Sequence, residues 1–382
     1  MKKVAVVTAT RAEYGILRPL IMCLEAEAEI ELQLLVTGTH LSEKYGKTED
    51  EIVKDGLPIY ERIPILEEGN SAYDVSCTMA NAIKGFAGYF AKEHPDLVVI
   101  LGDRTEMLGI CSAAMNECIP IAHLHGGELT EGAVDDCVRH ALTKMSYLHF
   151  PAAEEYRKRI IQLGEKPDRV FNVGALGVEN ILKAPLLSYE EMCKNVGIPQ
   201  GKKYVVATFH PVTLEKRSAA EQVDALIDAM RQKDEYYYLI TKANSDVGGA
   251  LVNDRFEAYC QSVSNAKLVA SLGMQRYLSA VKYSSFVLGN SSSGIIEAPA
   301  FGVPTVNIGD RQKGRLMADT IIQCDAETAA IVAAMDKAVD AARKVSGLYG
   351  DGNTSEKIVN IIKEFLFGEK VDLKKKFYDV EF

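Results

Sequence analysis

Residues Val98–Asp136 read VVILGDRTEMLGICSAAMNECIPIAHLHGGELTEGAVDD, and this stretch decides the fold class. An apolar run that begins at Leu97 ends in G-D-R, and a second short apolar run, Ile119–Ala122, ends in H-L-H-G-G-E. Polar residues therefore follow two predicted strands that are separated by a helical pattern. Ligands of open parallel sheets bind beside the carboxyl ends of the strands. We therefore expect a parallel α/β sheet with a reaction site at this edge.

The same alternation extends to both sides of this stretch. Predicted strands of the first half are Lys3–Thr8, Ile30–Val36, Leu97–Leu101, Ile119–Ala122, Tyr147–Phe150 and Arg169–Val173. After a polar helical segment, residues 173–199, the alternation restarts with strands at Tyr204–Phe209, Tyr236–Thr241, Lys267–Ala270, Ser285–Gly289 and Thr305–Ile308. Repeated β-α-β order predicts parallel sheets with right-handed crossovers.

We therefore expect two Rossmann-like domains, residues 1–175 and 176–365, that face each other across a cleft. The polar segments Glu356–Phe367 and Lys370–Phe382 are predicted to be helical. The tail, residues 366–382, is expected to cross back to the first domain.

The composition limits the classes of function. The chain has 382 residues, 47% of them hydrophobic and 25% charged, and a net charge of −10. An acidic chain is a poor general nucleic-acid binder, and no apolar run approaches the roughly 20 residues of a membrane helix. The eight cysteines form no C-x-x-C pair, which is typical of reduced thiols in the cytoplasm and gives no zinc motif.

Acidic residues follow the predicted strands in two places. Asp103 has two interpretations, because an acid after a strand commonly caps the next helix and is also suited to catalysis. Asp135 and Asp136 begin a predicted helix, where they would compensate the helix dipole. Arg139 and His140 lie one turn further on and are expected partners of these acids.

The H-L-H-G-G-E motif is more specific. Gly126 and Gly127 permit a sharp turn or a close approach of the backbone to a ligand. In an extended segment His123 and His125 would point to one face. A metal site of His and Glu side chains is the less favoured alternative, because the H-E-x-x-H spacing is absent. Glu128 is the stronger catalytic candidate.

An anion-binding feature occurs at the first predicted helix start. Residues 10–15, T-R-A-E-Y-G, follow the first strand, and helix amides together with the Arg11 guanidinium favour an anion. Arg104 lies in the G-D-R motif. There is no G-x-G-x-x-G, so a dinucleotide cofactor is not expected.

The second half has its own strand-end motifs. His210 follows a strand in F-H-P-V-T and is expected to face the cleft, and Asn244 follows the next strand. Residues 289–299, G-N-S-S-S-G-I-I-E-A-P, lead from a strand directly into a helix. Their amides and hydroxyls form a predicted phosphate nest with Glu297 one turn inside. Arg311 lies on the next strand-end loop.

The ordered set of motifs T-R-A-E-Y-G, G-D-R, H-G-G-E, D-D-x-x-R-H-A-L-T-K, F-H-P-V-T and N-S-S-S-G-I-I-E-A-P resembles the hydrolysing UDP-N-acetylglucosamine 2-epimerases of bacterial sialic and legionaminic acid synthesis. The resemblance covers nearly the whole chain and implies the GT-B fold. It also implies anti elimination of the nucleoside diphosphate to a 2-acetamidoglucal, followed by addition of water to release the free 2-epimer.

The resemblance implies roles for individual residues. The expected catalytic residues are Asp103, Glu128, Asp135 or Asp136, and His210. The expected substrate-binding residues are Arg11, Arg104, Asn244, Asn290, Ser291, Ser292, Ser293, Gly294, Glu297 and Arg311. No cofactor and no metal are expected, and the partner is a UDP-linked sugar.

The sequence leaves alternatives open for the substrate and for the class of protein. The preferred substrate is UDP-N-acetylglucosamine, with a 2,4-diacetamido-2,4,6-trideoxyglucose nucleotide as the alternative. A GT-B glycosyltransferase or a nucleotide-sugar sensor would share the nest but would not need the clustered acids. The resemblance implies a homodimer or homotetramer, and the predicted helix 73–93 is a candidate interface.

Overall fold

The computed structural model describes residues 1–67, 69, 71–130, 134–211, 218–243, 249–270, 272–368 and 373–381. The chain forms two compact units, Met1–Asn180 with Tyr349–Phe382, and Ile181–Leu348. The division falls within α7 (Leu176–Lys183). The chain returns to the first unit at Tyr349, earlier than the residue 366 that the sequence suggests.

The first unit contains a six-stranded sheet in the order β3-β2-β1-β4-β5-β6. Its strands are β1 (Lys2–Thr8), β2 (Ile30–Thr37), β3 (Glu61–Ile63), β4 (Leu97–Leu101), β5 (Ile121–Leu124) and β6 (Leu148–Phe150). Every pairing between these strands is parallel. The carboxyl ends of β1, β4 and β5 therefore meet at one edge.

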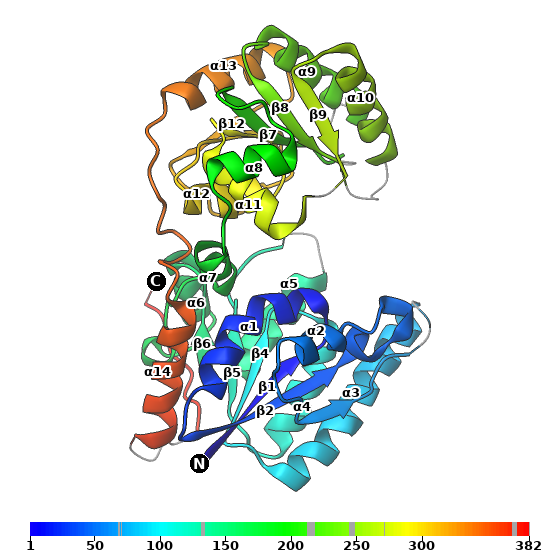
Figure 1. Cartoon of the computed structure of the whole chain (residues 1–382). Helices are drawn as coiled ribbons and strands as arrows, with labels where there is room; N and C mark the ends of the chain where they lie inside the picture. Colours follow the sequence, from blue (N-terminus) through cyan, green and yellow to red (C-terminus); the bar gives the residue numbers. More distant parts are fainter. Residues whose placement is uncertain are drawn as a thin grey trace. The chain divides into compact units, whose positions relative to one another are not determined.

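Helices cover both faces of this sheet. They are α1 (Arg11–Glu25), α2 (Glu49–Lys54), α3 (Ala72–Glu93), α4 (Thr105–Asn116), α5 (Val134–Met145), α6 (Glu154–Gln162) and α14 (Thr354–Phe367), and three short 3-10 turns are η1 (Gly38–Leu41), η2 (Glu43–Tyr45) and η3 (Pro167–Arg169). Val4 and Val6 pack into the core with α1 and α14, whereas Ala5 and Val7 pack into the core with α3 and α4. This alternation is the period of two that a strand buried on both faces requires. Helix α14 lies beside α1 although the two are at opposite ends of the sequence (Figure 1).

The second unit repeats this plan with a parallel sheet in the order β12-β11-β10-β7-β8-β9. Its strands are β7 (Tyr204–Thr208), β8 (Tyr237–Thr241), β9 (Ala266–Val269), β10 (Val287–Gly289), β11 (Thr305–Ile308) and β12 (Ile321–Cys324). Its helices are α8 (Tyr189–Val196), α9 (Ala219–Gln232), α10 (Gly249–Ser262), α11 (Gly273–Tyr283), α12 (Ser293–Ala300) and α13 (Thr328–Asp340). The expected α/β class with two parallel sheets is confirmed.

Two predicted strands are wrong, and two observed strands were not predicted. The expected strand Arg169–Val173 forms only a single bridge, Val170 with His149, and the Arg157 side chain occupies the Val170 carbonyl at 2.9 Å. The expected strand Ile119–Ala122 lies two residues later, because Pro120 has no N–H to donate to a ladder. The two short edge strands β3 and β12 were not predicted.

The expected helix Lys370–Phe382 is also wrong for its described part. Residues 373–381 contain no helix. The segment is held against the first unit instead, by Tyr378 N–H donating to the Gly164 carbonyl at 3.0 Å and by Lys375 Nζ donating to the Lys144 carbonyl at 2.9 Å. These long-range contacts take the place of helical hydrogen bonds.

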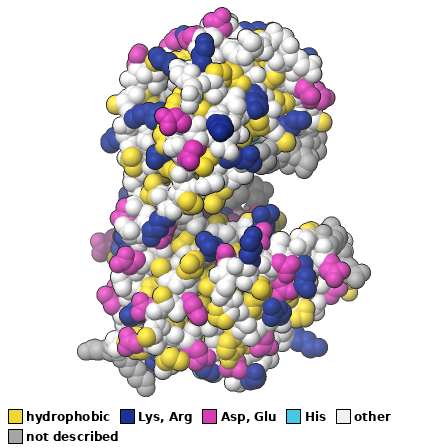
Figure 2. All heavy atoms as spheres, viewed as in Figure 1, with side chains coloured by type: hydrophobic (Ala, Val, Ile, Leu, Met, Phe, Trp, Pro, Cys, Tyr) yellow, Lys and Arg dark blue, Asp and Glu magenta, His cyan; other side chains and the backbone are white. Residues whose placement is uncertain are grey.

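The surface carries both signs of charge. On the face drawn in Figure 2, Lys and Arg side chains are interspersed with Asp and Glu side chains over each unit. In the described part of the chain, no helix combines the length and the apolar character that a membrane crossing requires.

Candidate active site

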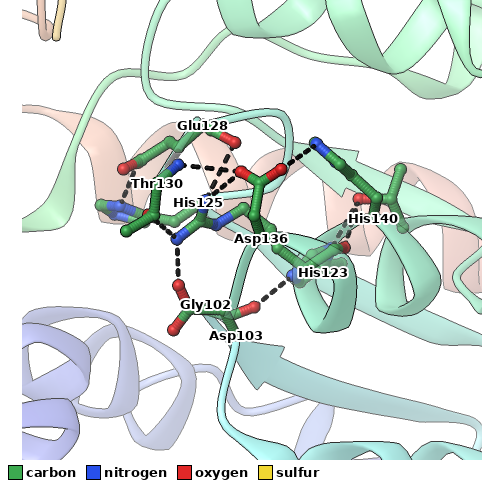
Figure 3. A network of polar contacts seen from close by, with 10 residues as sticks. Gly102, Asp103, His123, His125, Glu128, Thr130, Asp136 and His140 are labelled. Atoms are coloured by element: carbon green, nitrogen blue, oxygen red, sulfur yellow. Dashed lines mark hydrogen bonds and ion pairs between the residues drawn. The ribbon is translucent and has the colours of Figure 1, made fainter. Parts of the chain in front are cut away.

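Arg139 of α5 joins three segments at the carboxyl edge of the first sheet. Figure 3 shows the polar side chains that meet there, among them Asp103, Glu128 and Asp136. The Arg139 guanidinium donates to the Asp103 carboxylate after β4, to the Glu128 carbonyl at 2.9 Å and to Thr130 Oγ1 at 3.0 Å after β5. Asp136 Oδ1 lies 3.6 Å from Arg139 Nη1. The Arg139 side chain is only 6% exposed, so this buried cation fixes the positions of the acids around it.

The network separates catalytic candidates from helix caps. Asp103 does not cap α4, because the N-cap residue is Arg104 and the Asp103 carboxylate binds Arg139. Asp136 accepts the Thr130 N–H at 2.8 Å. It also lies 3.5 Å from His140 Nε2 and 3.6 Å from Arg139 Nη1, so the expected partners of this acid are confirmed. Asp135 is exposed, so the structure brings only the second of the two acids into the network.

The two histidines of the H-L-H-G-G-E motif do not share a face, contrary to the expectation. His123 is inside β5 and fully buried, its Nε2–H donates to the Gly102 carbonyl at 2.7 Å, and burial lowers its pKa to about 3. His125 lies beyond the strand with a left-handed φ of 61°, and its Nδ1 is 3.0 Å from Glu128 Oε1. No group of three metal-type ligands is present among the described residues.

A pocket of about 280 Å³ opens at this edge and is lined by Glu13, Asp103, Arg104, His125, Glu128 and Arg139, among others. Glu13 is 7% exposed, and its Oε2 accepts the Ala9 N–H at 2.9 Å. Its Oε1 is buried and has no hydrogen-bond partner within the part of the chain that the structure describes. Burial raises the pKa of Glu13 to about 7, although Arg104 opposes this shift.

Sequence reasoning missed Glu13 as a member of the site. The spacing of Thr10 and Glu13 is that of a capping box, and Thr10 Oγ1 does accept the Glu13 N–H at 3.2 Å. The sequence carries no signal that the carboxylate is buried beside Asp103. The predicted anion ligand Arg11 is exposed instead and pairs with Glu51 at 2.8 Å. Arg104 lines the pocket and pairs with Glu106 at 2.6 Å.

In the second unit, Asn290 joins the carboxyl ends of β7 and β10. It is fully buried, and its Oδ1 accepts the His210 N–H at 2.7 Å while its Nδ2 donates to the His210 carbonyl at 2.8 Å. Gly289 permits this approach, since its φ is 130° and a Cβ there would lie 1.9 Å from the Thr208 carbonyl oxygen. The amide of Asn290 thus fixes the backbone at His210.

The serine run that follows leads into α12 as predicted, but no serine side chain caps the helix. Ser292 is the N-cap residue without a side-chain cap bond, and Ser291 Oγ accepts the Ser293 N–H at 3.3 Å. Tyr277 donates to Ser293 Oγ at 2.7 Å. Burial raises the pKa of Glu297. Its Oε2 has no hydrogen-bond partner in the described ranges of the chain and is therefore suited to a ligand hydroxyl.

Two further side chains support this nest from the loop after β11. Arg311 Nη1 donates to the Asn290 carbonyl at 3.1 Å, and Gln312 Nε2 donates to the same oxygen at 2.9 Å. The Gln312 contact was not foreseen. Gly294, the last residue of the nest, approaches β11, and its carbonyl accepts from Thr305 Oγ1 at 2.8 Å. The predicted site residue Asn244 lies outside the described residues.

The fold and these strand-end groups define an α/β protein with the features of a nucleotide-sugar enzyme. The family model described as UDP-N-acetylglucosamine 2-epimerase matches residues 22–363, and the chain belongs to this family. The family resemblance seen in the sequence is therefore confirmed.

Several relatives are similar over most of their length. A GDP/UDP-N,N'-diacetylbacillosamine 2-epimerase (hydrolyzing) of Campylobacter jejuni is 41% identical over 325 residues, which cover 85% of this chain and 84% of the relative. Polysialic acid biosynthesis protein P7 of Escherichia coli is 38% identical, with 100% of this chain and 98% of the relative covered. The UDP-N-acetylglucosamine 2-epimerase of Neisseria meningitidis is 31% identical, with 88% of each covered.

A crystal structure of UDP-GlcNAc 2-epimerase from Neisseria meningitidis bound to UDP-GlcNAc has a TM-score of 0.78 at 18% identity and covers 95% of this chain and 100% of that chain. This likeness confirms the GT-B fold class.

Proposed function

We propose that this protein is a hydrolysing 2-epimerase that converts a UDP-linked 2-acetamido sugar into the free 2-epimer and UDP. The observation that carries the proposal is the group of acids around Arg139, beside a pocket, in a chain of this family. A glycosyltransferase would not require these clustered proton-transfer groups.

The reaction places specific demands on such a site. The proton on carbon 2 is not acidic, so its removal must be assisted by departure of the diphosphate. Inversion at carbon 2 requires proton transfer at opposite faces of the ring. Two groups are therefore needed, and general acid–base groups are most effective when their protonation states can change near neutral pH. We assign these transfers to the cluster of polar groups that contains Asp103, His125, Glu128 and Asp136.

The second unit supplies the groups suited to the nucleotide. The Asn290–Gly294 segment presents amides and hydroxyls at the start of α12, where a diphosphate is favoured by the helix dipole. Glu297 is proposed to accept from the ribose hydroxyls. Arg311 holds the nest through the Asn290 carbonyl. Arg11 and Arg104 of the first unit, and His210 of the second, are the proposed contacts to the departing phosphate and the sugar.

Two substrates are candidates. UDP-N-acetylglucosamine is the preference from the sequence motifs, and the Neisseria meningitidis relative carries that substrate in its name. The relatives at 41% and 35% identity are named for N,N'-diacetylbacillosamine, which supports the 2,4-diacetamido sugar at least as strongly. Both substrates share the reacting carbons 1 and 2, so the same catalytic groups serve either one.

The test is incubation with each UDP-sugar in heavy water, followed by NMR of the released sugar. We expect UDP, the free 2-epimer and one deuterium at carbon 2. Release of neither 2-epimer would refute the function. Interconversion without release of UDP would instead indicate a non-hydrolysing epimerase, and product without deuterium would indicate simple hydrolysis or transfer.

We also propose a cytoplasmic homo-oligomer, either a dimer or a tetramer. Exposed apolar residues of α3, Tyr73 at 76%, Val75 at 45% and Ile83 at 39%, support this helix as the interface. Light scattering would measure the assembly, and Ile83→Asp should dissociate it.

A further inference from the structure

His125 and Glu128 form a hydrogen-bonded pair in the pocket at the edge of the first sheet. His125 Nδ1 lies 3.0 Å from Glu128 Oε1, while its Nε2 is buried and has no hydrogen-bond partner among the described residues. Buried polar atoms are nearly always paired, so an unpaired ring nitrogen suggests a partner that arrives with a ligand. Since His125 also lines the pocket, a substrate is the natural source of that partner.

The backbone gives a second, independent reason to regard this imidazole as functional. His125 has a φ of 61°, in the left-handed region that side-chain-bearing residues seldom adopt. Its N–H donates to the Phe150 carbonyl at 3.1 Å, which ties this turn to the end of β6. The turn separates His125 from His123, which remains buried in β5. Unusual backbone conformations of this kind gather at active sites.

The other ring nitrogen of His125, Nδ1, contacts the Glu128 carboxylate, and the position of Glu128 is itself fixed. Arg139 donates to the Glu128 carbonyl at 2.9 Å, so the loop that carries Glu128 is attached to α5. A carboxylate on Nδ1–H sets the tautomer that leaves Nε2 as the acceptor, and it stabilises the imidazolium that forms after proton transfer. The charged groups around the ring are Glu128 on its own loop, Asp136 and Arg139 on α5, Asp103 and Arg104 after β4, and Glu13 on α1.

We infer that His125 is the catalytic base of the elimination and that Glu128 is its positioning residue. This inference rests on the proposed function. His125 Nε2 accepts the proton of carbon 2, the C–H electron pair forms the double bond between carbons 1 and 2, and the bond from carbon 1 to oxygen breaks with its electrons leaving on UDP. The proton that water addition later returns to the other face of carbon 2 comes from a different group, within the acids around Arg139.

The decisive variant is His125→Gly, because glycine adopts a positive φ without strain and leaves room for free imidazole. We expect UDP release to fall at least ~100-fold, which is the usual contribution of a general base, and UDP affinity to stay within about threefold of wild type, because the proposed nest and ribose groups lie in the second unit. Added imidazole should restore the rate at least ~10-fold by supplying the missing base. The 2-acetamidoglucal of the accepted sugar, supplied directly, should still be hydrated.

Glu128→Gln tests the positioning role. It should lower kcat about tenfold with little change in KM, and imidazole should not restore it, since the native ring is still present. The double variant should be no slower than His125→Gly alone, because a positioning residue cannot act without the group that it positions.

His94→Gly is the matched control. His94 is also a left-handed histidine, with a φ of 42°, but it ends α3 before β4, at the opposite edge of the sheet, and its loss should leave turnover unchanged. A folded His125→Gly protein that keeps turnover within threefold, or whose loss imidazole does not restore, overturns the inference. Failure of the proposed function would show separately, as a wild-type protein that releases no 2-epimer.

Discussion

Replacement of Arg139 by methionine tests whether one buried cation holds the acids of the first unit together. Methionine fills much of the same volume but removes the donors to Asp103, the Glu128 carbonyl and Thr130, and the ion pair to Asp136. Removal of one partner from a buried charge network costs about 3–5 kcal/mol. Asp103 and Asp136 are 28% and 26% exposed, so water recovers part of this loss. We therefore expect a loss of about 2–3 kcal/mol.

For a unit of this size, 1 kcal/mol corresponds to about 2–4 °C in melting temperature. Calorimetry should thus show a decrease of about 4–12 °C for Arg139→Met. Turnover should fall by at least ~100-fold, because the acids lose their fixed geometry, while UDP binding should be retained, because the proposed nest and ribose groups are in the second unit. Arg139→Lys keeps the charge, but an ammonium does not reproduce the planar fork, so turnover should remain low.

The matched control is Lys158→Met on α6 of the same unit. Lys158 is 61% exposed and pairs with Glu155 at 2.8 Å. Exposed ion pairs contribute at most about 1 kcal/mol, so its melting temperature should change by no more than ~4 °C. If Arg139→Met melts no lower than this control, the buried network does not stabilise the unit as we have argued.

Three further changes have defined outcomes. Burial raises the pKa of Glu13 from 4.5 to about 7, so its stabilising contribution is present below pH 4.5 and is lost as the pH rises through 7. Between pH 5 and pH 8, the free energy of unfolding of Glu13→Gln should therefore rise by up to ~3 kcal/mol relative to that of the wild type. A difference in urea midpoint between variant and wild type that is the same at pH 5 and pH 8 would contradict this. Gly289→Ala should lower the free energy of unfolding, measured in urea, by at least ~3 kcal/mol, because the added Cβ would lie 1.9 Å from a β7 carbonyl oxygen. Gly15→Ala on α1, where a Cβ would meet open space, should instead raise the free energy of unfolding by ~0.5–1 kcal/mol. Asn290→Ala should lower UDP affinity at least ~10-fold by calorimetry, since two buried backbone groups of His210 lose their partners; unchanged affinity would show that the nest does not depend on this amide.

The sequence was sufficient for the architecture because the relevant signals are local. A run such as Leu97–Leu101 is apolar at every position, as a strand buried on both faces must be, and Gly102 with Asp103 marks where it ends. The predictions failed where a local pattern had a competing long-range partner. Arg157 occupies the carbonyl that an expected strand at Val170 would have used.

The sequence by itself determined two parallel α/β units, the strand-end positions of Asp103, Glu128 and His210, and the nest that begins at Asn290. The tertiary structure alone decided which of these groups act together, because burial and charge partners depend on which strand ends become neighbours. Arg139 reaches Asp103 across 36 residues, and Glu13 is desolvated by elements far from it in the sequence. The left-handed turn at His125 separates two histidines that strand periodicity would place together. Such contacts leave no periodic trace in a sequence, and so only the folded chain shows them.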